Sequence, residues 1–195
     1  MNDQEALQHF RDAGALLEGH FILTSGLRSP MYLQCAKVLM HPDRAATLCG
    51  ALAARIEAKL GDGAIDLVVS PALGGVIVGY EMGRQLDCPA IFTERVAGTF
   101  ELRRGFEIPK GAQILMAEDI VTTGLSSREC IDCIRDLGGD VVAASCLIDR
   151  SDGNVEVGVP LFALVRMRVP AYEPDKLPAT LAAIPAVKPG SRSLQ

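Results

Sequence analysis

The stretch that decides the fold reads QILMAEDIVTTGLSS and runs from Gln113 to Ser127. Its apolar start predicts a buried strand, and the adjacent carboxylates of Glu118 and Asp119 follow directly at the carboxyl end of that strand. Two further apolar residues then lead into a Thr-Thr-Gly turn, where a helix is expected to begin. Carboxylates without a partner at the end of a buried strand carry a large desolvation penalty. The pair therefore indicates a ligand site.

The turn after the carboxylates, Thr122–Ser126, combines hydroxyl groups with a glycine and the start of a helix. Free N–H groups and the helix dipole make such a place an anion site. A phosphate in this turn, with Glu118 and Asp119 accepting hydrogen bonds from neighbouring hydroxyls, is typical of a bound ribose 5-phosphate. The alternative is a turn in which the acidic residues only cap a helix. Two features at a fixed offset favour the phosphate site.

The rest of the chain alternates between helical and extended patterns. Apolar spacing predicts helices over Glu5–Glu18, Pro42–Leu60, Val76–Leu86 and Leu125–Leu137, and strands over His20–Leu23, Met31–Cys35, Ile65–Ser70, Ala90–Thr93, Gln113–Ala117, Val141–Ile148 and Leu161–Val165. This order predicts an α/β fold, an open and mainly parallel sheet with helices on both faces. Ligands of such sheets bind beyond the carboxyl ends of the strands.

The expected organisation is one core with a small appendage. Residues 1–40 would form an N-terminal helix and a hood segment, residues 41–169 the core, and residues 170–195 a C-terminal tail. The segments before about residue 40 and after about residue 165 are expected to form a hood over the ligand edge. The end of the tail, from Lys188 to Ser193, is expected to fray.

Composition limits the classes of partner. Hydrophobic residues make up 49% of the 195, tryptophan is absent, and the net charge is −5 with a pI of about 5.2. An acidic chain without a basic surface speaks against nucleic acid as a partner. The first residues do not resemble a signal peptide, and the most apolar stretch, Ala64–Tyr80, is too interrupted to span a membrane. We expect a soluble cytoplasmic protein without a membrane partner.

The six cysteines do not suggest a metal or redox site. Cys130 and Cys133 form a CxxC, but no second pair lies nearby to complete a zinc site. The CxxC is expected to lie inside the predicted helix rather than at its start. We therefore interpret it as two helical cysteines that meet by chance.

The Gln113–Ser127 stretch resembles the phosphoribosyl pyrophosphate signature of the type I phosphoribosyltransferases. The shared pattern is a strand, Glu-Asp, two apolar residues, Thr-Thr-Gly, one residue and Ser, over about 13 residues of this chain. The stretch lacks the glycine-lysine pattern of P-loop nucleotidases and the glycine pattern of dinucleotide-binding proteins. The resemblance implies the type I phosphoribosyltransferase fold and a site for phosphoribosyl pyrophosphate.

Three further segments resemble the orotate phosphoribosyltransferase family within that superfamily. Gly19–Tyr32 is similar to the family's hood segment, and Ser70–Gly75 stands where the family has its pyrophosphate-facing loop. Asp149 and Arg150 occupy the place of an Asp-Arg pair whose arginine contacts orotate in the family. Together these matches cover most of residues 19–150.

The resemblance implies a set of site residues and a reaction, the transfer of ribose 5-phosphate to orotate in pyrimidine synthesis. It assigns phosphoribosyl pyrophosphate binding to Leu73, Gly74, Arg95, Glu118, Asp119, Ile120, Val121, Thr122, Thr123, Gly124, Leu125 and Ser126. Orotate would be bound by Ser25, Gly26, Tyr32, Thr122 and Arg150. The catalytic set would be Glu118, Asp119, Arg95, Arg103 and Arg104. Mg²⁺ would arrive with the substrate, because the sequence offers no dedicated metal cage.

Some positions depart from the common pattern of the family. Thr24 stands where many members carry Lys, and Leu73-Gly74 stands where many carry Tyr-Lys. The polar segment Glu94–Phe106 contains three arginines but no Lys or His, unlike the mobile loop of many members. We expect Glu94–Lys110 to form a long mobile loop or hairpin, with Glu94–Phe106 acting as a lid; the alternative is a solvated surface hairpin. The resemblance further implies a homodimer in which each lid closes over the partner's active site.

Two alternatives to this interpretation remain at the level of sequence. A phosphoribosyltransferase for a purine or another base is disfavoured by the Ser-Gly hood and by Arg150, since a guanidinium suits a base that carries a carboxylate. A non-catalytic regulator that only senses phosphoribosyl pyrophosphate is the alternative from another class. The lack of a DNA-binding appendage speaks against a DNA regulator.

Overall fold

A six-stranded sheet forms the centre of the protein, whose computed structural model describes residues 1–23 and 25–189. The strands lie in the order β5-β4-β3-β6-β7-β8. Their bounds are β3 Leu67–Pro71, β4 Ala90–Val96, β5 Thr99–Leu102, β6 Gln113–Val121, β7 Asp140–Asp149 and β8 Leu161–Arg166. Strand β5 pairs antiparallel with β4, and the other pairs are parallel. The prediction of a mainly parallel sheet is confirmed.

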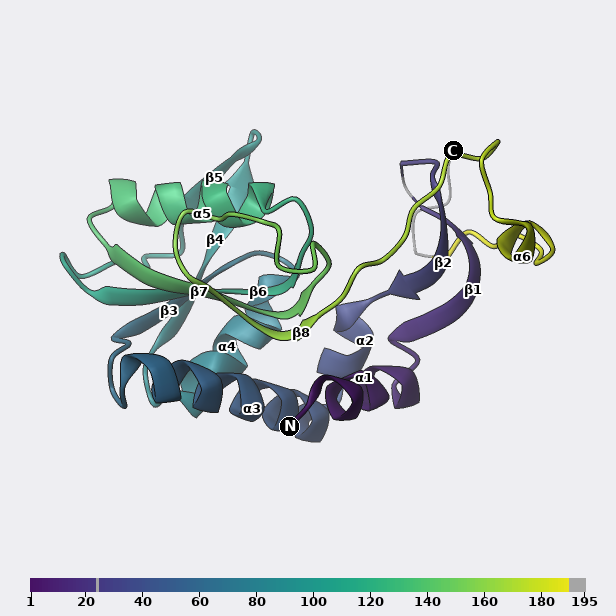
Figure 1. Ribbon diagram of the computed structural model, residues 1–195. Helices are drawn as coiled ribbons and strands as arrows, with labels where there is room; N and C mark the ends of the chain where they lie inside the picture. The colour runs from purple at the N-terminus through teal and green to yellow at the C-terminus, as the bar shows by residue number, and fades with distance from the viewer. Residues whose placement is uncertain (24, 190–195) are drawn as a thin grey trace.

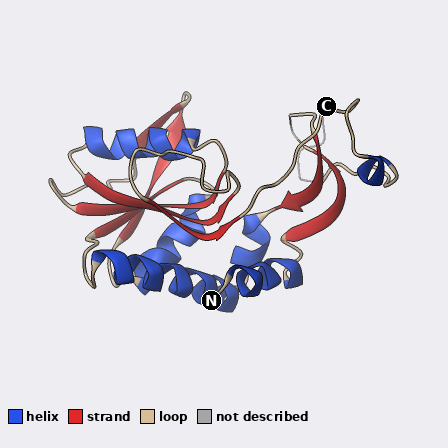
Figure 2. Ribbon diagram, in the orientation of Figure 1, coloured by secondary structure: helices blue, strands red, loops and turns tan. Residues whose placement is uncertain are grey.

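Helices cover both faces of this sheet, as Figures 1 and 2 show. On one face lie α1 (Asp3–Asp12), α3 (Pro42–Leu60) and α4 (Gly75–Gln85), and on the other lies α5 (Leu125–Asp136). Strand β6 shows why both faces need cover. Its Leu115 and Ala117 belong to the core under α3 and α4, whereas Ile114 and Met116 belong to the core under α5.

The hood is a separate two-stranded sheet beside the ligand edge. Strands β1 (Leu16–Ile22) and β2 (Arg28–Leu33) pair antiparallel, and the short helix α2 (Cys35–Leu39) leads back to the core. The C-terminal tail returns to the hood, where single bridges join Tyr172 to Arg28 and Val187 to Phe21. The tail also carries the short helix α6 (Ala179–Ala182), which lies beside β1 and β2 in Figure 1.

The N-terminal elements correct two sequence predictions. The helix expected over Glu5–Glu18 ends at Asp12, because Gly14 adopts a left-handed φ of 60° and the chain then enters β1 at Leu16. The strand expected over Met31–Cys35 ends at Leu33, and Cys35 instead begins α2. Part of the tail predicted to fray, residues 190–193, lies outside the described residues.

Two further expectations concern membranes and cysteines. No helix among the described residues is long and apolar enough to cross a membrane. Cys130 and Cys133 both lie within α5, as expected, and both are free thiols. Cys130 is fully buried and makes a 3.5 Å contact between its Sγ and the Thr93 Oγ1, which fits a packing role.

Candidate functional site

The paired carboxylates lie within the last residues of the central strand rather than after its end. Strand β6 continues to Val121, so the alternation of the strand directs Glu118 and Asp119 to opposite sides. Glu118 accepts a hydrogen bond from the Ser127 hydroxyl, and Asp119 accepts one from its neighbour's N–H (Ile120 N to Asp119 Oδ1, 2.9 Å). Both carboxylates are half-buried and have acceptor capacity left for a ligand.

The environment raises the pKa of both carboxylates. Burial raises the pKa of Glu118 to about 7, against the opposing effect of the Ser127 hydrogen bond, and the charge of Asp119 adds to the rise. Burial likewise raises the pKa of Asp119, against hydrogen bonds from backbone N–H groups. Perturbed carboxylates at a strand end are typical of functional sites.

The turn between β6 and α5 forms a small cradle, which we call the phosphate loop (residues 122–126). A cavity of about 60 Å³ lies within it and is lined by Glu118, Ile120, Val121 and residues 122–127. Gly124 at its centre has a left-handed φ of 70°, and no side chain among the described residues caps the start of α5. Uncapped N–H groups at a helix start are free to bind an anion.

A second loop reaches the same edge from β3. It contains Leu73, which is 89% exposed, and Gly74, which faces Asp119. A Cβ atom at Gly74 would lie 3.0 Å from Asp119 Oδ1, so a larger residue would crowd the carboxylate. The peptide bond between Ala72 and Leu73 is cis. The structure thus brings this loop next to the carboxylates, where the sequence placed it.

Arg150 lies at the end of the neighbouring strand, β7. Its backbone N–H donates to the carbonyl oxygen of Val121 at 2.9 Å, which holds it beside Thr122. The Nε atom of Arg150 is buried and has no hydrogen-bond partner among the described residues, and burial lowers the pKa of the guanidinium. Burial raises the pKa of the Cys35 thiol, the charge of Asp119 adds to the rise, and the charge of Arg150 opposes it. An unsatisfied guanidinium here can receive an anionic ligand.

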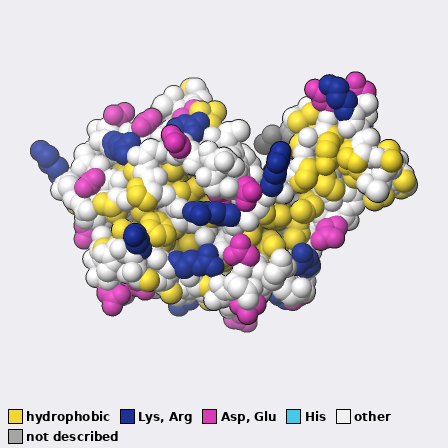
Figure 3. Space-filling model, in the orientation of Figure 1, with side chains coloured by type: hydrophobic (Ala, Val, Ile, Leu, Met, Phe, Trp, Pro, Cys, Tyr) yellow, Lys and Arg dark blue, Asp and Glu magenta, His cyan; other side chains and the backbone are white. Residues whose placement is uncertain are grey.

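The predicted orotate residues of the hood are not joined to this edge by hydrogen bonds among the described residues. Ser25 and Gly26 lie exposed in the turn between β1 and β2, and Tyr32 packs against Phe21 with ring centroids 5.9 Å apart. None of the three makes a hydrogen bond with the carboxylate edge within the described part of the chain. Figure 3 shows the surface hollowed between the hood and the body of the protein.

The arginines of the predicted lid pair with carboxylates of the same subunit. The segment is a hairpin built from β4 and β5, so the hairpin form of the prediction is confirmed. Arg95 pairs with Glu129 of α5 (Nη2 to Oε2, 2.5 Å) and lies 4.1 Å from the Phe100 ring. Arg103 and Arg104 both pair with Glu94, the former at 3.5 Å from Nη1 to Oε2. The structure does not bring these arginines to the carboxylates of β6.

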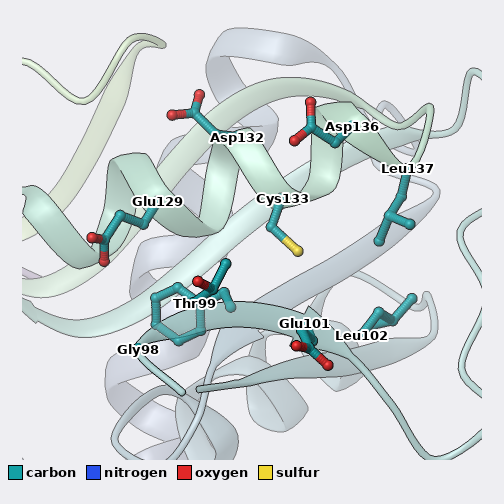
Figure 4. Close-up of a pocket in the computed structure, with 10 residues that line it drawn as sticks. Gly98, Thr99, Glu101, Leu102, Glu129, Asp132, Cys133, Asp136 and Leu137 are labelled. Atoms are coloured by element: carbon teal, nitrogen blue, oxygen red, sulfur yellow. The ribbon is translucent and has the colours of Figure 1, made fainter. Parts of the chain in front are cut away.

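A larger groove lies elsewhere and does not suit an anionic substrate. It occupies about 540 Å³ between β5 and α5, and Figure 4 shows Cys133 pointing into it from α5. Four carboxylates line it, from Glu101, Glu129, Asp132 and Asp136. Their negative charge would repel a phosphate, so the phosphate loop is the better candidate despite its smaller cavity.

The oxygen atoms at this edge are of the kind that bind Mg²⁺. The groups that line the edge are carboxylates and hydroxyls, the hard oxygen donors that Mg²⁺ prefers. Among the described residues no group of three or more His, Cys, Asp or Glu could hold a metal. An ion at this edge would complete its coordination with oxygens of water or of a bound ligand.

Several contacts that support the site were not predicted from the sequence. Ser127 lay in the quoted stretch but was given no role, although its hydroxyl holds Glu118. Asp149 is fully buried and accepts hydrogen bonds from Ser151 and Gly153, which fixes the chain around Arg150. The Cys35 thiol donates to the carbonyl oxygen of Asp119 at 3.8 Å. Only the Ser127 contact was accessible from the sequence, through the expected strand-turn-helix geometry.

Comparison with known proteins agrees with this geometry. Residues 38–160 match the phosphoribosyl transferase domain family. The chain is 61% identical to orotate phosphoribosyltransferase 2 of Mesorhizobium japonicum over 194 residues and 57% identical to orotate phosphoribosyltransferase of Phenylobacterium zucineum over 195 residues, with both chains of each pair fully covered.

A solved structure supports the fold independently. The crystal structure of orotate phosphoribosyltransferase from Aeropyrum pernix matches with a TM-score of 0.66 at 24% identity, over 82% of this chain and 92% of that one. At this identity the structural match speaks for the fold alone. The sequence matches extend over the whole chain, including the hood and the Asp149-Arg150 pair. The chain belongs to the orotate phosphoribosyltransferase family.

Proposed function

We propose that this protein transfers ribose 5-phosphate from phosphoribosyl pyrophosphate to orotate, which gives orotidine 5′-phosphate and pyrophosphate in pyrimidine synthesis. The observation that carries the proposal is the pair of half-buried carboxylates, Glu118 and Asp119, beside an uncapped helix start. The carboxylates can accept hydrogen bonds from ribose hydroxyls, and the N–H groups of the helix start can bind the 5′-phosphate. The carboxylates and the helix start are only a few residues apart in the chain, so both can contact the same sugar phosphate.

The carboxylates are proposed to bind the 2′- and 3′-hydroxyls of the ribose. These hydroxyls would donate to Glu118 and Asp119 in their ionised forms, and the positive charge that develops on the sugar as pyrophosphate leaves would be stabilised by both. Backbone N–H groups of the phosphate loop would donate to the 5′-phosphate. The Ser127 hydroxyl orients Glu118 for this role.

Arg150 is proposed to bind the carboxylate of orotate. Its buried Nε atom lacks a partner among the described residues, and a guanidinium bound to a carboxylate would satisfy it. Thr122 follows Val121, whose carbonyl oxygen accepts a hydrogen bond from the Arg150 N–H, and this supports the proposal that Thr122 contacts the same base. Ser25, Gly26 and Tyr32 remain proposed orotate contacts that require the hood to approach the edge.

The leaving pyrophosphate is proposed to lie between the β3 loop and the lid. Leu73 and Gly74 would offer backbone groups, and Arg95, Arg103 and Arg104 would supply positive charge after leaving Glu94 and Glu129. Mg²⁺, when bound with the substrate, would lower the charge on the leaving group. Closure of the lid would exclude water, so that hydrolysis does not compete with transfer.

A homodimer with shared active sites is proposed from an exposed apolar surface beside the β3 loop. Leu73, Ile77 and Tyr80 are 89%, 46% and 69% exposed, and the last two lie on one side of α4. Large apolar side chains that gather at a surface often mark an interface. In the proposed dimer each lid closes over the active site of the partner subunit. The division into residues 1–40, 41–169 and 170–195 and a cytoplasmic location remain further proposals.

Turnover with competing acceptors tests the proposed function. Purified protein, phosphoribosyl pyrophosphate and Mg²⁺ are mixed with equal amounts of orotate, guanine and uracil, and the nucleotide products are separated and quantified. The proposal expects orotidine 5′-phosphate to be the main product. A purine nucleotide as the main product would identify another base, and binding of phosphoribosyl pyrophosphate without any product would identify a non-catalytic sensor.

A further inference from the structure

The segment between β7 and β8 packs directly on the phosphate loop. We call residues 151–158 the flap. A Cβ atom at Gly124 would lie 2.6 Å from Cγ2 of Val155 and 3.0 Å from Cγ1 of Val157, so no space separates the loop from the flap. Val157 is 2% exposed and packs into the core under α5. The conformation of the phosphate loop therefore depends on where the flap lies.

One guanidinium fastens the loop and the flap together. Arg128 lies in the first turn of α5, and its Nη1 atom donates to the carbonyl oxygen of Thr123 at 3.1 Å and to that of Glu156 at 2.9 Å. The same Nη1 atom is 3.0 Å from the position of a Cβ atom at Gly124. Charged donors form stronger hydrogen bonds than neutral ones. Arg128 is thus a clamp between the loop and the flap.

The other end of the flap is fixed to the residue beside the base site. Buried Asp149 accepts hydrogen bonds from Ser151 (N to Oδ1, 2.8 Å; Oγ to Oδ1, 2.6 Å) and from the N–H of Gly153 (2.9 Å to Oδ2). Ser151 Oγ in turn accepts from the N–H of Val155 at 3.0 Å. Arg150 lies between Asp149 and Ser151, so the flap begins directly after Arg150 and is held to the residue before it.

We infer that Arg128 is a positioning residue that couples the 5′-phosphate site to the base-binding arginine through the flap. It contacts two carbonyl groups rather than the substrate. Its loss would loosen the phosphate loop and would displace Arg150, so both substrates would bind more weakly. This inference rests on the proposed function for the identity of the base, but the effect on phosphate binding is independent of it.

Arg128→Met tests the inference, with Arg135→Met as the matched control. Met keeps most of the apolar stem of Arg but removes the charge and the donors. Arg135 donates to the flap at Gly158 (Nη2 to O, 3.3 Å) without touching the phosphate loop. Binding of ribose 5-phosphate is measured by calorimetry, and the apparent KM for each substrate is measured in the forward reaction.

Arg128→Met is expected to weaken ribose 5-phosphate binding about tenfold, the loss expected for one charge-assisted hydrogen bond. The apparent KM should rise for phosphoribosyl pyrophosphate and also for orotate, with a smaller change in kcat. Arg128→Lys, which keeps a cation within reach of both carbonyls, should restore most of the affinity. Arg135→Met should leave both KM values unchanged. Should Arg128→Met fail to fold, Arg128→Gln, which is too short to join both carbonyls, is measured in its place with the same expectation.

Three results would overturn the inference. The first is unchanged ribose 5-phosphate affinity and unchanged KM values in the Met or Gln variant. The second is a rise in KM for phosphoribosyl pyrophosphate alone, which would deny the coupling to Arg150. The third is an equal effect of Arg135→Met, which would assign the loss to general loosening of the flap. If the wild-type protein binds ribose 5-phosphate but does not use orotate, the proposed base is wrong, and the phosphate-binding part of the test still stands.

Discussion

Gly124→Ala is the substitution whose consequences follow most directly from the structure. Gly124 lies at the centre of the phosphate loop with a φ of 70°, where a side chain is disfavoured by the backbone alone. An added Cβ atom would also lie 2.6 Å from Cγ2 of Val155 and 3.0 Å from both Cγ1 of Val157 and Nη1 of Arg128. Two separate penalties therefore apply, one from the backbone and one from packing.

The two penalties can be separated with a matched glycine. Gly111 has a φ of 75°, close to that of Gly124, but nothing lies within 4 Å of its Cβ position. Gly111→Ala should cost about 1–2 kcal/mol of unfolding free energy for the left-handed backbone. Gly124→Ala should cost about 1–3 kcal/mol more, because its methyl group overpacks the contact with the flap. The entropic gain of replacing glycine is common to both variants and cancels in the comparison.

Urea unfolding and ligand binding together provide the assay. The difference in unfolding free energy between the two variants is read from urea titrations, and ribose 5-phosphate binding is measured on each folded protein. Gly111→Ala should bind like the wild type, whereas Gly124→Ala should lose most of its affinity. If Gly124→Ala is no less stable than Gly111→Ala and binds with wild-type affinity, the loop is not packed against the flap as described.

Three other predictions concern the chemistry. Burial raises the pKa of Glu118 from 4.5 to about 7. The value of kcat/KM for phosphoribosyl pyrophosphate should therefore rise with pH through about 7, and Glu118→Gln should flatten this rise. The free protein should lose stability as pH rises from 4.5 to about 7, because Glu118 ionises at a lower pH in the unfolded chain than in the folded protein. A wild-type profile that is flat between pH 6 and 8 would contradict this (a range of about one unit either side of the pKa). Arg150→Ala should raise the apparent KM for orotate roughly tenfold or more, the value of a charge-assisted hydrogen bond, and should raise that for phosphoribosyl pyrophosphate far less; equal effects would remove Arg150 from the base site. Arg103→Ala should lower kcat. Mixing the Arg103→Ala protein with the Asp119→Asn protein should restore activity, because one site of a mixed dimer can combine an intact lid with an intact ribose site. No recovery after confirmed subunit exchange would refute the shared site.

Much of the core of the fold could be predicted because local patterns and burial agree there. The strand, carboxylates, turn and helix of residues 113–127 are contiguous, and each part has its own signal in the sequence. Ser127 directly follows the loop, in the first turn of α5, so its contact with Glu118 follows from the same geometry. The chief difference is that β6 continues through the carboxylates, because β7 pairs with it as far as Asp149.

The N-terminal region and the tail could not be predicted in detail because long-range pairing decides them. Leu7, Phe10 and Leu17 fit a helical spacing, but Gly14 turns the chain and Leu17 pairs with Tyr32 in the hood. The tail pairs with strands more than 140 positions earlier, as in the bridge between Tyr172 and Arg28.

The supports of the site depend on tertiary contacts for the same reason. Cys35 reaches the carbonyl oxygen of Asp119 across 84 positions, and Arg128 reaches that of Glu156 across 28. No spacing rule for a helix or a strand links residues so far apart. The residues proposed to touch substrate lie in local motifs, whereas Cys35 and Glu156, which contact the site or its clamp, lie far from those motifs in the chain.

The central claim is that the carboxylates at the end of β6 hold the ribose during transfer, and Asp119→Asn tests it most directly. Asn keeps the acceptor for the Ile120 N–H, so that hydrogen bond is retained. The substitution also removes a carboxyl group whose pKa is raised by burial, so no stabilising charge is lost. The free protein should therefore be as stable as the wild type. The formation of orotidine 5′-phosphate is followed together with thermal unfolding. We predict that kcat/KM falls at least about tenfold, the loss of one charge-assisted hydrogen bond, at an unchanged Tm. A variant that retains the wild-type kcat/KM at an unchanged Tm would contradict the ribose role of this site.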